Sequence, residues 1–138
     1  MNNTDTQAIG ALVLRVSIGI VLIAHGLLKV MVFTLPGTAQ FFASVGFPGW
    51  SAYPVTLIEI AGGVLLISGF ATRWVSLALV PVLLGATSVH LGAGWLFTNA
   101  NGGWEYPAFL TAALVVQALL GPGAYALNLP RIAGPKPA

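Results

Sequence analysis

The amino-acid sequence predicts an all-α integral membrane protein, a four-helix bundle with a short interfacial helix between helices 1 and 2. Of its 138 residues, 57% are hydrophobic and only 6% are charged. Soluble domains carry about 25% charged residues because their surfaces face water. Four apolar stretches approach the roughly 20 residues that cross the hydrocarbon core as a helix. The length predicts one domain, residues 1–138, without a separate soluble module.

The first predicted span covers residues 8–32 and ends before Pro36 and Gly37, which are turn-forming residues. Residues 38–45 follow as a short helical stretch that contains two phenylalanines. This stretch is too short to cross a bilayer, so we expect it to lie in the membrane interface.

Three further spans are predicted, at residues 52–70, 74–95 and 105–127. Pro107 fits the first turn of the last one, where a proline is tolerated. We expect that last helix to resume after the Gly-Pro-Gly sequence at positions 121–123.

Basic residues predict the orientation, because short cytoplasmic loops are rich in Lys and Arg. Arg73, Arg131 and Lys136 fall on one side of a four-span chain, and the loops on the other side contain neither residue type. Both termini are therefore expected in the cytoplasm. Aromatic residues then form a belt at the outer interface: Trp50, Tyr53, Trp95, Trp104 and Tyr106.

Ionisable residues from all four predicted spans converge on the outer layer. His25 and Lys29 are four residues apart and share one helix face. Glu59 and His90 come from the second and third spans at a similar depth, and Glu105 opens the fourth. Ionisable groups within a membrane are costly and usually mark a functional site. We therefore predict the catalytic residues His25, Glu59 and His90, and the substrate-binding residues Lys29, Trp95, Trp104 and Glu105.

Each of these residues also has a simpler interpretation. Lys29 can extend to the headgroups, or it can pair with Glu59 in a structural ion pair. A histidine on an apolar helix can be a hydrogen-bonded packing residue, and Glu105 suits a helix N-terminus through the helix dipole.

Two polar residues lie deeper in the predicted spans. Arg15 either extends to the cytoplasmic phosphates, which we favour, or caps a pocket. Gln117 is expected to bond between helices.

Several chemistries are excluded by the residue types present. The chain has no cysteine, so it offers no thiolate. It lacks a nucleotide-binding glycine loop and an EF-hand, and its net charge of +2 does not indicate nucleic-acid binding. No metal site is predicted. The start of the chain has no basic segment typical of a signal peptide.

Short motifs follow one another in order across residues 8–129: Arg15 with His25-Gly26 and Lys29, Pro36-Gly37 with Gln40-Phe41-Phe42 and Gly46-Phe47-Pro48, Glu59-Ile60-Ala61-Gly62-Gly63, Gly69-Phe70-Ala71-Thr72-Arg73, Asn101-Gly102-Gly103-Trp104-Glu105-Tyr106-Pro107, and Gly121-Pro122-Gly123. Each motif is weak alone, but the ordered set resembles the DoxX family of bacterial inner-membrane proteins. Asn128 departs from the pattern, because an acidic residue is expected there.

The resemblance implies a four-helix inner-membrane subunit linked to oxidoreductase systems. The related DoxD proteins look like subunits of a thiosulfate:quinone oxidoreductase, and other members are associated with sulfur transfer and oxidative-stress defence. Without a cysteine, any thiol chemistry would belong to a partner. The expected partners are the lipid bilayer, a redox or thiol-handling protein and a second copy of the chain, but no nucleic acid.

The predicted function is a membrane subunit of a redox complex that binds a quinone-like or other small lipophilic substrate in the outer half of the bundle. A quinone is favoured over haem or a metal as cofactor. His25 and His90 would donate hydrogen bonds or protons to a carbonyl-type oxygen. Glu59, tuned by Lys29, would accept a proton or orient a histidine. The alternative is a non-enzymatic scaffold or small-solute permeability protein whose buried charges are structural.

Overall fold

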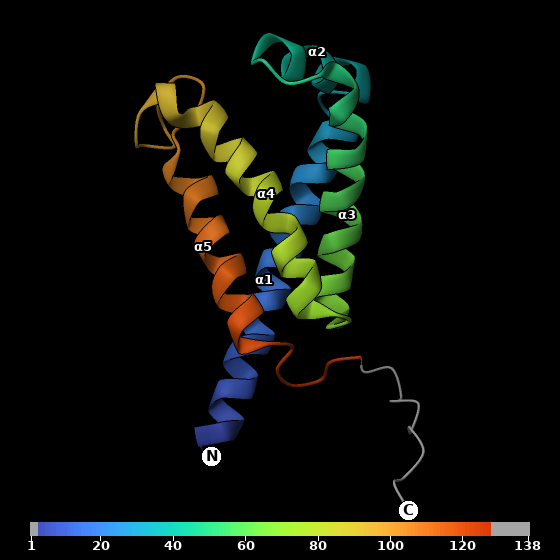
Figure 1. Ribbon diagram of the computed structural model, residues 1–138, viewed down its shortest axis with the longest axis vertical. Helices are drawn as coiled ribbons and strands as arrows, with labels where there is room; N and C mark the ends of the chain where they lie inside the picture. Colours follow the sequence, from blue (N-terminus) through green and yellow to red (C-terminus); the bar gives the residue numbers. More distant parts are fainter. Residues whose placement is uncertain (1–2, 128–138) are drawn as a thin grey trace, which may run out of the picture.

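A computed structural model describes residues 3–127, and in this part of the chain every regular element is a helix (Figure 1). The elements in order are α1 (Asn3–Met31), α2 (Leu35–Ser44), η1 (Gly49–Ser51), α3 (Ala52–Ser68), α4 (Thr72–His90), η2 (Leu91–Ala93) and α5 (Glu105–Leu120). The predicted all-α membrane fold and its short helix after the first span are thereby confirmed.

Within the described residues, three helical segments are long and apolar enough to cross a membrane: Asn3–Met31, Gly49–Ser68 and Thr72–Ala93. α5 is apolar but has only 16 residues. Large apolar side chains cover the outside of these helices, among them several that are 57–73% exposed: Val13, Ile20, Leu57, Phe109 and Leu119. Such a surface is stable against lipid rather than water.

The helices pack as two pairs, α1 with α3 and α4 with α5, and α3 joins the pairs through α4 (Figure 1). Small residues allow the first pair to approach closely. A Cβ atom on Gly26 would lie 2.4 Å from Ile60, so only glycine fits there. Leucines from both pairs meet in the core, including Leu22, Leu66, Leu79 and Leu114.

α2 caps one end of the bundle. It begins at Leu35, slightly before the predicted residue 38, because Thr34 Oγ1 accepts a hydrogen bond from Gly37 N and Pro36 suits the first turn. Thr38 Oγ1 donates back to the carbonyls of Thr34 and Lys29, which ties α2 to the end of α1. Figure 1 shows α2 and the loop between α4 and α5 at the end opposite the start of α1.

The predicted continuation of the fourth span to residue 127 is wrong. α5 ends at Leu120, because Gly121 adopts a positive φ of 82° and Pro122 has no N–H to extend the helix. The chain then turns across the bundle, where Ala124 N donates to Ala8 O at 2.9 Å and Leu127 N donates to Ser68 O at 3.0 Å. The predicted departure at Asn128 lies outside the described residues.

Arg15 does not extend to the lipid phosphates as we favoured from the sequence. Its side chain is 1% exposed, and its N–H groups donate to backbone carbonyls at the ends of two helices. The acceptors are the carbonyls of Leu66, Ile67, Pro122, Ala124 and Tyr125. The first two belong to the last turn of α3, where the helix leaves its carbonyls short of donors, although Leu66 O also accepts from Gly69 N at 3.1 Å. Arg15 therefore holds α1, α3 and the segment after α5 together.

Gln117 also differs from the prediction. Its amide Nε2 donates to Gly121 O at 2.7 Å, and Gly121 directly follows the helix that carries Gln117. The side chain therefore closes its own helix end instead of joining two helices.

Candidate functional site

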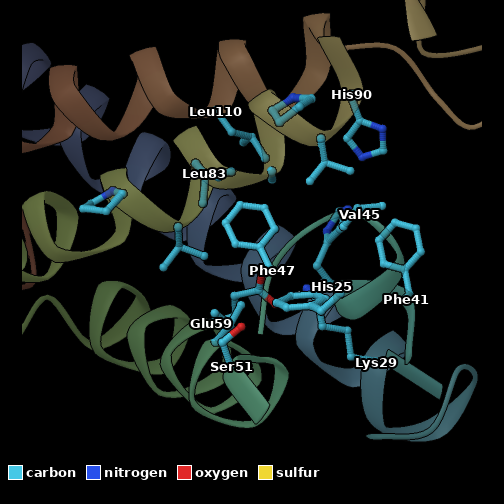
Figure 2. Close-up of a pocket in the computed structure, with 18 of the residues that line it drawn as sticks. His25, Lys29, Phe41, Val45, Phe47, Ser51, Glu59, Leu83, His90 and Leu110 are labelled. Carbon is cyan, nitrogen blue, oxygen red and sulfur yellow. The ribbon is translucent and has the colours of Figure 1, made fainter. Parts of the chain in front are cut away.

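A cavity of about 430 Å³ lies between the two helix pairs, beneath α2. Its walls are mostly apolar and come from all five α-helices, with Phe41 and Phe47 on one side and Leu83 and Leu110 on another (Figure 2). The polar groups that line it are few: His25, Lys29, Ser51, Glu59, His90 and the ring of Tyr106.

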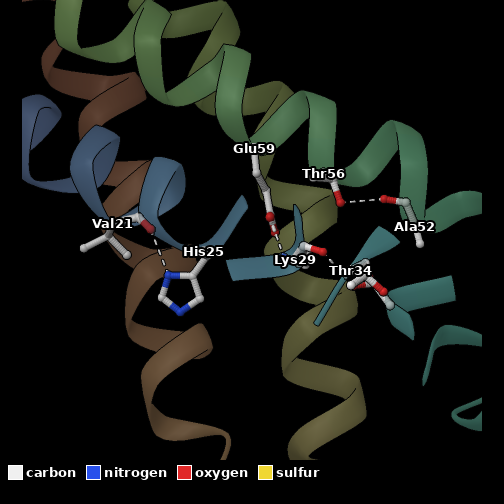
Figure 3. A network of polar contacts seen from close by, with 8 residues as sticks. Val21, His25, Lys29, Thr34, Ala52, Thr56 and Glu59 are labelled. Atoms are coloured by element: carbon white, nitrogen blue, oxygen red, sulfur yellow. Dashed lines mark hydrogen bonds and ion pairs between the residues drawn. The ribbon is translucent and has the colours of Figure 1, made fainter. Parts of the chain in front are cut away.

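Lys29 and Glu59 form an ion pair at the cavity, with Lys29 Nζ 2.5 Å from Glu59 Oε2 (Figure 3). The side chains are 18% and 9% exposed, so both are largely removed from the surface. The predicted contact between these two residues is therefore confirmed. Because Lys29 points to a carboxylate inside the bundle, it does not extend away to the headgroups.

His25 lies one turn before Lys29 on the same face of α1. Its Nδ1 is 2.8 Å from the Val21 carbonyl oxygen (Figure 3), and its ring stacks on Tyr106 of α5 with centroids 5.7 Å apart. The stacking links α1 to α5 at the cavity wall, where Figure 2 also labels His25.

His90 is the last residue of α4, where its ring lines both the cavity and a second hollow formed with Asn99, Ala100 and Asn101. Its Nδ1 lies 2.9 Å from the Asn101 carbonyl oxygen. His90 thus stands between the inner cavity and the loop that follows α4. The structure brings His25, Lys29, Glu59 and His90 to one cavity, although they come from three helices.

The hydrogen bonds of the two histidines determine which ring nitrogen carries the hydrogen. A carbonyl oxygen can only accept, so Nδ1 of each ring must donate. In the neutral imidazole, Nε2 is then an acceptor with a free lone pair. The predicted donation from His25 and His90 to a carbonyl oxygen is therefore not available to the neutral rings.

Trp95, Trp104 and Glu105, which the sequence assigned to substrate binding, do not line this cavity. The two tryptophan rings pack edge to face with centroids 4.5 Å apart, and Glu105 Oε1 accepts a hydrogen bond from Phe97 N at 2.8 Å. Backbone bonds from Trp104 N to Gly94 O and from Glu105 N to Trp95 O close the base of the same loop. The chain reverses direction between α4 and α5, and these contacts stabilise the loop that makes the reversal.

Two groups of cavity residues were missed as site residues. Phe41, Phe42 and Phe47 cover the cavity from α2 and the turn that follows it, and Tyr106 supports His25. The sequence does show these phenylalanines concentrated in and just after a helix that is too short to cross the membrane, and this pattern could have indicated a cover over a cavity. Among residues 3–127, no group of three or more His, Asp or Glu side chains is placed to hold a metal ion.

The fold and cavity define an apolar helical membrane protein with an internal polar cluster. The chain belongs to the DoxX family, whose model matches residues 10–99. It is 41% identical over 105 residues to a protein named "Putative oxidoreductase CatD" of Bacillus subtilis (strain 168), covering 75% of each chain. No solved structure matches it.

Two further relatives carry names that state a location. The chain is 28% identical to the inner membrane protein YqjF of Escherichia coli (strain K12), over 88% of this chain and 92% of that one. It is 29% identical to the inner membrane protein YphA of the same organism, over 85% of this chain and 86% of that one. Together with the apolar helices, these relatives identify a bacterial inner-membrane protein.

Proposed function

We propose that the protein is a membrane subunit of a redox complex and binds a quinone-type or similar small lipophilic ligand in the cavity beneath α2. The volume of about 430 Å³ falls in the range of small-molecule sites, which are mostly apolar with a few placed polar groups. The name of the relative CatD, an oxidoreductase, and the family membership support the redox assignment.

The observation that carries the proposal is the placement of the polar groups. An ion pair and two histidines from three helices face one apolar space, although each is costly inside a membrane. A flat aromatic ligand would contact the phenylalanines of α2 with its ring and the Lys29–Glu59 end with its oxygen atoms. Electrons would be exchanged with a partner protein.

The orientation belongs to the same proposal. Both termini lie in the cytoplasm, and α5 is the fourth crossing, about 24 Å long at 1.5 Å per residue. The hydrocarbon core is about 30 Å thick, so the loop before α5 and the segment after it complete the crossing. The cavity then lies in the outer half of the bilayer.

Gly85 offers a test because it lines the cavity without carrying any polar group. A Cβ atom there would lie 3.8 Å from Phe47 Cζ, so a larger side chain can enter the cavity instead of the helix contact. Gly85→Leu should weaken the binding of decylubiquinone in lipid nanodiscs by at least about tenfold, which corresponds to 1.4 kcal/mol. The melting temperature should stay near that of the wild type.

Gly10→Leu is the matched control, because a Cβ atom on Gly10 has no atom within 4 Å and Gly10 lies outside the cavity. It should leave binding unchanged. A wild-type protein that binds no quinone and copurifies with no lipophilic ligand would refute the proposal. It would favour the scaffold interpretation, in which the Lys29–Glu59 pair only holds the helices together.

A further inference from the structure

The sequence suggested that the two cavity histidines donate hydrogen bonds to a ligand. In the structure Nδ1 of each ring bonds to a backbone carbonyl, so Nε2 of the neutral ring is an acceptor. Nδ1 of His25 is occupied by the Val21 carbonyl, and within residues 3–127 no protein group bonds to its Nε2. The free lone pair of Nε2 is therefore the group that a ligand meets on this ring. His90 repeats the arrangement through the Asn101 carbonyl.

Lys29 adds a donor beside this acceptor. It follows His25 by four residues on α1, so the two side chains share one helix face, and both line the cavity. The ammonium group has three N–H donors, and Glu59 accepts from one of them. One face of α1 thus brings an acceptor and a donor to the wall of the cavity.

A hydroxyl group matches this pair, whereas a carbonyl oxygen does not. A hydroxyl can donate to His25 Nε2 and accept from Lys29 Nζ at the same time. A carbonyl oxygen can only accept, so it would place its lone pairs against the lone pair of Nε2. Because His25 is exposed, an analogue that leaves its Nε2 unpaired loses the net contribution of one hydrogen bond and not the larger cost of a buried unpaired group.

We infer that the cavity prefers the reduced, hydroxyl-bearing form of an aromatic ligand, a hydroquinone, over the oxidised quinone. The inference rests on the proposed ligand site and specifies its hydrogen-bond polarity. His25 Nε2 accepts the hydroxyl hydrogen, Lys29 donates to the hydroxyl oxygen, and Tyr106 fixes the His25 ring by stacking. His90 also lines the cavity (Figure 2), and its Nε2 is a second acceptor when Nδ1 donates to Asn101 O.

The first test needs no ligand. The chain has two histidines, so ¹⁵N-histidine labelling gives one pair of ring signals for each, and His90→Gln assigns them. At neutral pH, the ¹⁵N chemical shifts of His25 should show a protonated Nδ1 and a bare Nε2. A protonated Nε2 with a bare Nδ1 would overturn the inference, whatever the protein binds.

The second test compares three probes of nearly equal shape in nanodiscs without oxygen: decylubiquinol, decylubiquinone and the dimethyl ether of decylubiquinol. The ether keeps the reduced ring but has no hydroxyl hydrogen. The quinol should bind about 3- to 10-fold more tightly than either other probe, as expected for one net hydrogen bond.

His25→Phe keeps a ring to stack on Tyr106 but removes the lone pair, so it should bind all three probes with similar affinity. Trp95 lies outside the cavity, so the Trp95→Phe variant should keep the preference for the quinol. If wild type binds the three probes equally, or the quinone most tightly, the inference fails while the proposed function stands. If none of the probes binds, both fail.

Discussion

Gly19 of α1 and Gly63 of α3 face each other so closely that neither position has room for a side chain. A Cβ atom on Gly19 would lie 2.7 Å from the Gly63 carbonyl oxygen, and a Cβ atom on Gly63 would lie 2.7 Å from the Gly19 carbonyl oxygen. Because each position meets a backbone oxygen of the partner helix, as well as an isoleucine side chain, only a separation of α1 from α3 would relieve the clash. The same helices carry Lys29 and Glu59, so this contact also sets the distance across the ion pair.

We therefore expect Gly19→Ala to lower the free energy of unfolding by about 1–3 kcal/mol, the usual cost of overpacking a close contact. Unfolding by sodium dodecyl sulfate from mild detergent measures it. Gly10→Ala is the control in the same helix, because nothing lies within 4 Å of its Cβ position. Its effect should stay within about 0.5 kcal/mol. Equal losses for the two variants would contradict the close contact.

Lys29 and Glu59 should be coupled energetically. Glu59→Gln leaves the Lys29 charge without its carboxylate, so it should destabilise the protein, and Lys29→Met should recover part of the loss. The expected coupling in the double-mutant cycle is about 1–3 kcal/mol. Free energies of unfolding of the four proteins measure it.

A second cycle shows whether that coupling is specific. Glu105 bonds to Phe97 N instead of Lys29, so Glu105→Gln and Lys29→Met should be additive within about 0.5 kcal/mol. If the Lys29–Glu59 cycle is additive to the same degree, the ion pair does not stabilise the bundle.

Arg15 should tolerate no replacement, not even by lysine. A lysine has one terminal nitrogen and cannot reach the α3 carbonyls and the carbonyls after α5 together. We expect Arg15→Lys to cost roughly 2–4 kcal/mol, since several charged hydrogen bonds are lost in a buried place. Arg73→Lys, at an exposed position, is the matched control and should change little. A stable Arg15→Lys protein would show that the carbonyl contacts contribute little.

Both ends of the chain should be cytoplasmic. A green fluorescent protein fused at residue 138 should be fluorescent, and alkaline phosphatase fused there should be inactive. Alkaline phosphatase inserted in the loop at Ala100 should be active, because that loop lies at the opposite end of the bundle from the start of α1 (Figure 1). The reverse pattern would refute the orientation and would place the cavity in the inner half of the bilayer.

The sequence predicts the all-helical membrane fold well, because the bilayer imposes a fixed length on apolar segments. Depth was enough to bring His25, Lys29, Glu59 and His90 to one layer, and the four do line one cavity. Depth does not predict which nitrogen of a histidine is free, since that depends on a carbonyl such as that of Asn101, eleven residues away.

Sequence reasoning failed where the backbone supplies the partners. Arg15 was expected to leave the bundle because the carbonyls that bind it leave no pattern in the sequence. Trp95 and Trp104 were assigned to the site from their residue type and depth, although a hairpin-like loop turns them toward each other. Gly121 and Pro122 were visible as turn formers, but the return of the chain to Ala8 follows from tertiary packing.

The contacts of Arg15 also have a consequence for biogenesis. Its acceptors stand at positions 66–67 and 122–125, so the first helix enters the bilayer while most of them have not yet been synthesised. An unpartnered arginine at the centre of a helix costs about 2.5 kcal/mol or more during insertion. Until the segment after α5 has been synthesised and folds back, the guanidinium of Arg15 therefore lacks most of its carbonyl partners.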